Sequence, residues 1–211
     1  MMHLHDIRYV RLGTPDLAST ARYATEVLGV EVARKTDKAV YLRSDSRDHT
    51  LVYFEGDPRD HTVGFEMATA GEVDAAASAL DNAGYAVQPG SQEECEQRCV
   101  DSFVRFIDPS GNRIELVHRP HHSGRRYFAS RDAGITGFSH IGLRSTDPAR
   151  DELFWTGLTN ARVSDRIGKS PLLRIDAVHH KIVCFRLPIQ VYSTSTIRLR
   201  ASTTSCAPIT S

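Results

Sequence analysis

Hydrophobic side chains recur with two different periods along the first part of the chain. Alternation of apolar and polar positions predicts a strand at residues 7–12, and β-branched and aromatic runs predict strands at 39–43 and 50–54. After the first strand, apolar residues with helical spacing predict a helix. The apolar face of this helix consists of Leu17, Ala21, Ala24 and Leu28.

Both ends of this helix carry residues with capping preferences. Thr14 is expected as the N-cap, Pro15 as the first helical residue, and Gly29 as the residue that ends the helix. The first unit is therefore predicted to have the order βαβββ.

A second unit with the same order follows. An alternating strand at 61–67 leads into an alanine-rich helix at 72–83, which Gly84 ends. Strands at 103–107 and 113–117 flank the sequence Asp-Pro-Ser-Gly-Asn, which predicts a β-hairpin.

The chain also repeats itself at an offset of 131 residues. The sequence RYVRLGTPD at 8–16 returns as SHIGLRSTD at 139–147, so that Tyr9 corresponds to His140. The same offset carries His49 onto His180. One offset for two separated segments indicates a duplicated structural unit.

The third unit is accordingly predicted to follow the plan of the first. Asp147 caps a helix that begins at Pro148, and Phe154 and Trp155 are expected in the core of that helix. The predicted strands lie at 138–143, 172–175 and 181–185.

These units predict an α+β fold built from tandem βαβββ modules. We expect an N-terminal pair of modules at 5–119 and a linker rich in histidine, arginine and glycine at 120–136. The first module of an incomplete C-terminal domain is expected at 137–185.

A fourth module does not follow in the sequence. Residues 186–211 contain no Asp, Glu, Gly, Lys or His, and ten of these 26 residues are Ser or Thr. Two explanations are a disordered tail and a slipped reading frame. One choice of codons, read in a shifted frame, restores a histidine-bearing strand and the start of an acidic helix. We therefore expect an aberrant, disordered tail that arose from a frameshift or an equivalent artefact.

Composition restricts the partners. The 26 basic and 26 acidic residues give no net charge, so neither nucleic acid nor a membrane surface is expected as a partner. No membrane span or signal peptide is present, so a cytoplasmic location is expected. The four cysteines are too irregular for a disulfide framework. Cys95 and Cys99 can share a helical face, but no second pair completes a zinc site.

Three motifs resemble a known family. They are DPSGNRIEL at 108–116, GFSHIGLRSTD at 137–147 and HHKIV at 179–183. Together with the paired modules, they resemble the vicinal oxygen chelate superfamily of glyoxalases, bleomycin resistance proteins and dioxygenases. The ordered set of motifs has this histidine only in the third unit, which narrows the resemblance to type I extradiol ring-cleaving dioxygenases. The resemblance covers residues 5–185.

The resemblance implies an enzyme of aromatic hydrocarbon catabolism. In that family the N-terminal pair is structural, and the C-terminal pair holds one Fe(II) through two histidines and one glutamate. His140 matches the first histidine ligand, and His180 matches the acid/base histidine beside the metal. The implied substrates are O2 and an aromatic diol of the 2,3-dihydroxybiphenyl or catechol type. The intact form is expected to be a homo-oligomer.

The chain departs from this pattern at the metal. Two histidines and one carboxylate leave three adjacent positions on Fe(II) open for a diol and for dioxygen. The second histidine and the glutamate would lie in the fourth module, so the chain as written holds one of the three ligands. We therefore expect little or no activity from this chain.

A hypothesis of another class stays open. The N-terminal pair could act as a metal-dependent isomerase or lyase of the glyoxalase type, with His61 and Glu115 as ligands, or as a non-catalytic small-molecule binding protein. A structural role is favoured for Glu115, because its other partners would have to include Tyr9 or His5. The histidine at 180 could also be structural, since His49 occupies the equivalent place in a unit where no metal is expected.

Overall fold

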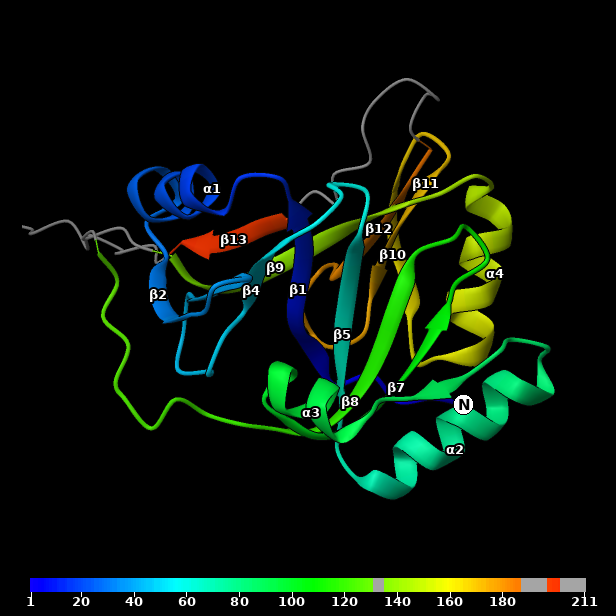
Figure 1. Cartoon of the computed structure of the whole chain (residues 1–211). Helices are drawn as coiled ribbons and strands as arrows, with labels where there is room; N and C mark the ends of the chain where they lie inside the picture. The colour runs from blue at the N-terminus through cyan, green and yellow to red at the C-terminus, as the bar shows by residue number, and fades with distance from the viewer. Residues whose placement is uncertain (131–134, 187–196, 202–211) are drawn as a thin grey trace, which may run out of the picture.

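The first module of the chain contains four strands and a short helical segment. The computed structural model of the protein describes residues 1–130, 135–186 and 197–201 (Figure 1). The elements of the first module are β1 (Asp6–Thr14), α1 (Leu17–Tyr23), the π-helical η1 (Ala24–Leu28), β2 (Glu31–Lys35), β3 (Ala39–Arg43) and β4 (Leu51–Glu55).

The first helix begins later than predicted. Its N-cap is Asp16, whose carboxylate accepts a hydrogen bond of 2.9 Å from the backbone N–H of Ser19. The prediction of Thr14 as the N-cap was wrong, because Thr14 is the last residue of β1 and pairs with Glu55. The predicted end is confirmed, since Gly29 follows η1 in the left-handed conformation with φ of 74°.

The second module follows the predicted plan and adds a short helix, α3. Its elements are β5 (His61–Met67), α2 (Ala70–Asn82), β6 (Gln88–Pro89), α3 (Gln92–Arg98), β7 (Val100–Ile107) and β8 (Arg113–Pro120). The predicted hairpin is confirmed by the antiparallel pairing of β7 with β8. The carboxylate of Asp108 fixes its turn by accepting hydrogen bonds from the backbone N–H groups of Ser110 and Asn112.

The two modules form one sheet with mirrored halves. The strand order is β2-β3-β4-β1-β5-β8-β7-β6. Within each module the first and last strands pair in parallel, as β1 with β4 and β5 with β8. The antiparallel pairing of β1 with β5 joins the modules. The predicted α+β fold of tandem βαβββ modules is therefore confirmed.

The third module builds a second sheet in the order β10-β11-β12-β9-β13. Asp147 caps its helix through the N–H groups of Ala149 and Arg150, as predicted. The elements of this sheet and its helix are β9 (Ile135–Arg144), α4 (Pro148–Leu158), β10 (Arg162–Ile167), β11 (Ser170–Arg174), β12 (Ile182–Phe185) and β13 (Ile197–Ala201).

Strand β13 lies within the segment for which we expected disorder. It pairs antiparallel with β9, in the place that β5 takes beside β1 (Figure 1). Residues 187–196 and 202–211 lie outside the described residues, so the expectation for the tail as a whole stays a prediction. The same holds for the predicted limits of the domains.

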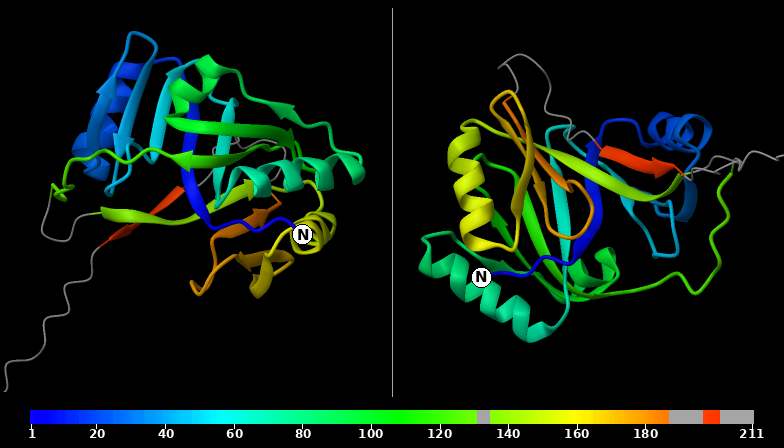
Figure 2. Two further views of the ribbon diagram at one scale, coloured as in Figure 1. Left: turned by 90° about the horizontal axis from the view of Figure 1, so that it is seen from below. Right: turned by 180° about the vertical axis from the view of Figure 1, so that it is seen from behind.

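Helix α4 connects the third module to the N-terminal sheet. The Trp155 side chain is 1% exposed, and its ring centroid lies 5.6 Å from that of Phe65 on β5. The Phe154 ring lies 5.0 Å from Tyr85 and 6.0 Å from Phe106. Figure 2 shows α4 and α2 on the same side of the molecule. The core positions predicted for Phe154 and Trp155 are confirmed.

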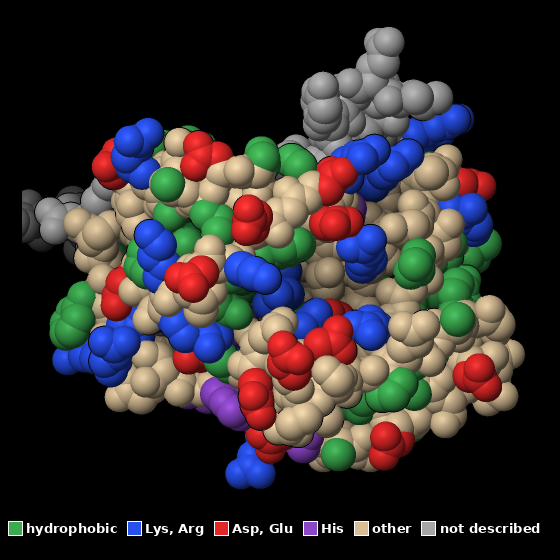
Figure 3. All heavy atoms as spheres, viewed as in Figure 1, with side chains coloured by type: hydrophobic (Ala, Val, Ile, Leu, Met, Phe, Trp, Pro, Cys, Tyr) green, Lys and Arg blue, Asp and Glu red, His purple; other side chains and the backbone are tan. Residues whose placement is uncertain are grey.

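Charged side chains of both signs are mixed over the face shown in Figure 3. Lysine and arginine lie beside aspartate and glutamate there, and neither sign forms a separate field.

None of the helices in the described residues has the length and apolar character needed to span a bilayer.

Replacing Trp155 tests whether the third module depends on this aromatic contact. Trp155→Ala is expected to lower the free energy of unfolding by about 3 to 5 kcal/mol, because it leaves a cavity beside Phe65. Leu153→Ala on the same helix is the control, since Leu153 is 73% exposed. That variant should change stability by no more than about 0.5 kcal/mol. Urea denaturation of both variants measures the difference, and equal effects would contradict the packing described.

Candidate functional site

The two histidines singled out in the third module lie side by side. His140 is on β9, and His180 precedes β12 by two residues. Parallel pairing sets Ile182 of β12 opposite Ile141 of β9, which brings the preceding residues together. The ring centroids of His140 and His180 are 4.4 Å apart, at an interplanar angle of 43°.

Neighbouring polar groups contact both rings. Nδ1 of His140 lies 3.3 Å from Oγ of Ser139. Nδ1 of His180 lies 2.9 Å from Nδ1 of His179, whose own side chain is 59% exposed. Both His140 and His180 are half-buried. The structure thus brings the two residues together, and their chemical roles stay predictions.

The first module reproduces this arrangement with a tyrosine in place of His140. Val10 pairs in parallel with Leu51, which is the 141–182 pair shifted back by 131 residues. The Tyr9 and His49 rings accordingly stack, with centroids 5.4 Å apart at an interplanar angle of 27°. The repeat seen in the sequence is therefore present in the register of the strands.

Tyr9 belongs to a buried polar cluster in the N-terminal pair. Its hydroxyl donates a hydrogen bond of 2.6 Å to Oε2 of Glu115. Arg98, at the end of α3, donates to both carboxylate oxygens of Glu115 at 2.8 and 2.7 Å. The side chains of Arg98 and Glu115 are only 9% and 2% exposed. This geometry is a bidentate ion pair shielded from water.

The protonation states follow from burial and charge. Burial, together with the negative charge of Glu115, raises the pKa of Tyr9 well above its ordinary value, so the phenol is neutral. Burial by itself lowers the pKa of Arg98, but the hydrogen bonds and charge of Glu115 outweigh it and raise that pKa. The cluster therefore consists of one cation, one anion and one neutral donor.

This cluster does not support a metal site formed by His61 and Glu115. Both oxygens of Glu115 are occupied by Arg98 and Tyr9. Glu115 is paired with Gly64 across the parallel β5–β8 ladder, whereas His61 is three residues from Gly64 and faces the other side of the sheet. The ring of His61 contacts Arg59 and Asn112 instead.

The packing of Tyr9 requires a glycine at position 64 of β5. A Cβ at that position would lie 2.6 Å from Cε2 of Tyr9, so the tyrosine ring can cross β5 only above a glycine.

A cavity of about 460 Å³ lies in the second module, and neither His140 nor His180 lines it. The lining residues are Thr62, Ala86, Gln88, Arg98, Arg105, Phe106, Ile107, Arg113 and Glu115.

The described residues around His140 do not complete a three-ligand iron site. Strand β13 runs opposite His140, with Arg198 at the paired position. Its sequence, IRLRA, contains no histidine, cysteine or acidic residue. Within residues 1–130, 135–186 and 197–201, three metal-ligating side chains come together only at Asp48, His49 and Cys99, in the N-terminal pair. Of the three predicted ligands, only the candidate His140 lies in the described part of the chain, and its role as a ligand stays a prediction.

Two features were not predicted from the sequence: the ion pair of Arg98 with Glu115, and the convergence of Cys99 with Asp48 and His49. A capping box formed by Ser91 and Glu94 marks the start of α3 and was a usable signal for the helix. No local signal indicates that the guanidinium of Arg98 turns inward to Glu115.

Comparison with known proteins identifies the family. Residues 6–116 of the 211-residue chain match the model of the Glyoxalase/Bleomycin resistance protein/Dioxygenase superfamily. This match spans more than half of the chain, which therefore belongs to that superfamily. The resemblance seen in the motifs is confirmed at this level.

The chain is similar to several ring-cleaving enzymes. It is 31% identical over 178 residues to an iron-dependent extradiol dioxygenase of Rhodococcus jostii (strain RHA1), covering 82% of this chain and 59% of the relative. It is 31% identical over 156 residues to a 1,2-dihydroxynaphthalene dioxygenase of Sphingobium xenophagum, covering 70% of this chain and 52% of the relative.

A solved structure of catechol 2,3-dioxygenase has the same fold. It superposes with a TM-score of 0.81 and 23% identity, over 93% of this chain and 70% of that one. The chain spans between 52% and 59% of the length of the two relatives above.

Removing the buried cation tests the structural role of the Glu115 cluster. Arg98→Gln is expected to lower the free energy of unfolding by about 3 to 5 kcal/mol, because it leaves the Glu115 carboxylate buried without its partner. Arg105→Gln is the matched control, since the Arg105 side chain is 39% exposed in its pair with Glu94. The control should lose less than about 1 kcal/mol. Equal losses in chemical denaturation would show that the buried pair has no special structural role.

Proposed function

We propose that this chain carries the structural N-terminal pair and the first metal-binding module of an Fe(II)-dependent extradiol ring-cleaving dioxygenase. The observation that carries the proposal is the contact between His140 and His180, whose rings lie 4.4 Å apart on the module where the sequence exchanges tyrosine for histidine. The similarity to an iron-dependent extradiol dioxygenase over 82% of the chain supports it. The proposed substrates are O2 and catecholic diols of the 2,3-dihydroxybiphenyl or catechol type.

The two histidines have different roles in this proposal. His140 is the metal ligand, because it lies on strand β9 and imidazole is a common donor to iron. His180 would act as an acid/base beside a bound diol in a complete site, since imidazole titrates near neutral pH. His179 contacts Nδ1 of His180 and orients its ring. When bound, Fe(II) would supply the positions where diol and dioxygen meet.

The described residues supply only His140 toward that metal, so they do not fit an iron site by themselves. No catalytic step is therefore assigned to this chain alone.

The cytoplasmic location and the homo-oligomeric state of an intact form stay predictions.

The purified 211-residue chain is expected to retain no stoichiometric Fe(II) and to show little or no ring cleavage. Loss of two of three ligands should largely abolish iron retention, because each ligand contributes to both affinity and geometry. Iron per chain after anaerobic reconstitution and gel filtration measures retention. The absorbance of the ring-opened product from 2,3-dihydroxybiphenyl or catechol measures turnover. Stoichiometric iron with turnover would refute this expectation.

A chimera tests the proposed roles of the two histidines. Residues 1–185 joined to the last module of the Rhodococcus jostii relative should bind Fe(II) and cleave a catechol. His140→Gln in the chimera should abolish iron binding. His180→Gln should keep the iron, but slow turnover and change its pH profile. Far-UV circular dichroism establishes that each variant folds. Iron binding that survives His140→Gln in a folded chimera would overturn the proposal.

A further inference from the structure

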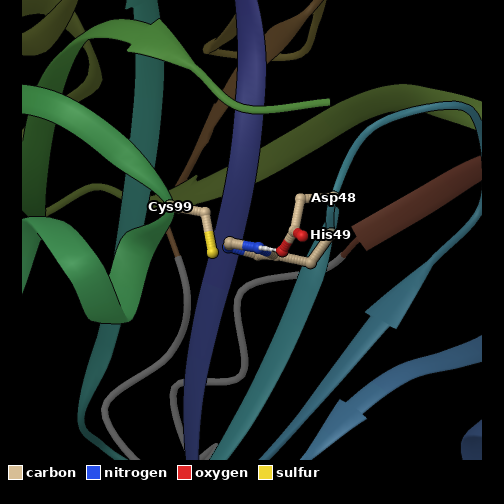
Figure 4. A group of neighbouring side chains, drawn as sticks. All are labelled: Asp48, His49 and Cys99. Atoms are coloured by element: carbon tan, nitrogen blue, oxygen red, sulfur yellow. Dashed lines mark hydrogen bonds and ion pairs between the residues drawn. The ribbon is translucent and has the colours of Figure 1, made fainter. Parts of the chain in front are cut away.

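Three side chains of different chemistry converge in the N-terminal pair, away from His140. Asp48 and His49 lie in the connection between β3 and β4, and Cys99 follows the last residue of α3. Figure 4 shows the three side chains pointing toward one another from these two segments. One ligand atom from each residue lies within 4.8 Å of the other two.

We propose that Asp48, His49 and Cys99 form a binding site for a thiophilic divalent cation of the Zn²⁺ class. Sulfur, nitrogen and carboxylate oxygen are the ligands that Zn²⁺ takes in proteins. With Zn–S near 2.3 Å and Zn–N near 2.0 Å, a tetrahedral site separates its ligand atoms by roughly 3.3 to 3.7 Å. All the ligand atoms lie within 4.8 Å of one another, so the closure that the site needs is at most about 1.5 Å, which side-chain rotation can supply.

His49 has the properties of a preformed ligand. Its side chain is 2% exposed, and burial lowers its pKa, so the imidazole is neutral at pH 7. Nδ1 lies 3.0 Å from Oδ1 of Asp48, whereas Nε2 is buried without a hydrogen-bond partner in the described residues. The rings of Tyr9 and Tyr41 hold the imidazole between them, with centroids 5.4 and 5.2 Å away. Nδ1 faces the carboxylate of Asp48, so it is the nitrogen that a cation held by Asp48 would take.

The charges of the site also balance. A carboxylate and a thiolate together neutralise a divalent cation, which makes a half-buried site feasible. Nη2 of Arg34 lies 3.5 Å from Sγ of Cys99 and can donate to the thiolate. In the free protein, burial and the neighbouring Asp48 raise the pKa of Cys99 to about 11, so cation binding has to release a proton from the thiol.

Two features limit the affinity. The positive charges of Arg8 and Arg11 act on His49 and oppose a second cation nearby. Three protein ligands leave the fourth position to water. The Asp48 side chain is 32% exposed, so the cation and this water can enter from solvent. We expect binding weaker than at a four-ligand structural zinc site.

Occupation of the site would join α3 to the β3–β4 connection. Helix α3 ends in Arg98, which holds Glu115 in the centre of the N-terminal sheet. A cation that binds only the folded state stabilises it by mass action. The site would therefore fasten the helix that positions the buried ion pair, independently of the proposed dioxygenase function.

Co²⁺ is the probe, because a cysteine thiolate bound to it gives a charge-transfer band and a tetrahedral site gives visible d–d bands. The full-length chain is first reduced and stripped of metal with a chelator. With one equivalent of Co²⁺ it should develop the charge-transfer band and the d–d bands, and added Zn²⁺ should displace Co²⁺ and remove these bands. Cys99→Ser should remove the charge-transfer band. Asp48→Asn and His49→Gln should weaken Co²⁺ binding by about tenfold or more.

Matched controls separate this site from other thiols and from the proposed iron ligand. Cys95→Ser removes a buried thiol four residues earlier, and His140→Gln removes the proposed iron ligand of the third module. Both variants should keep the Co²⁺ bands. Asp48→Asn changes charge with little change in shape, so it remains informative if Cys99→Ser does not fold. Absence of the bands in the wild-type chain would overturn the proposal, as would bands that persist in a folded Cys99→Ser variant.

Discussion

The packing of α4 against aromatic side chains of the N-terminal sheet fixes the position of the third module. Trp155 and Phe154 bury their rings among Phe65, Tyr85 and Phe106, and the same hydrophobic core continues through apolar residues of β9 and β12. A lone module would expose this surface to water. Because β9 and β12 carry or adjoin His140 and His180, the aromatic contact also determines where the proposed chemistry lies.

The same strand register produces two different sites in the two halves of the chain. In the first module, Tyr9 stacks on His49 and donates to Glu115, and the guanidinium of Arg98 supplies the positive charge. The third module has His140 at the corresponding place, beside His180. An internal ion pair thus stabilises the N-terminal half, whereas the third module places two histidines side by side, and metal ligation is proposed for one of them.

The sequence predicted the elements whose signals are local and repeated, including the strand at His61–Met67, the hairpin at Asp108 and the cap at Asp147. It did not predict β10, because five of its six residues are exposed and show no hydrophobic alternation. The helix start was misplaced at Thr14 because the pairing of that residue with Glu55 is non-local. The Asp48, His49 and Cys99 cluster was also beyond local patterns, since it depends on how α3 packs on the sheet.

Trp155 is the single tryptophan of the chain, so its fluorescence reports the contact between the third module and the N-terminal sheet. Far-UV circular dichroism reports the secondary structure of the whole molecule. Comparing both signals during equilibrium urea unfolding tests whether the modules share one core. A shared core predicts that the two transitions coincide, as in a cooperative two-state process. A fluorescence change complete before most of the circular dichroism signal is lost would contradict it.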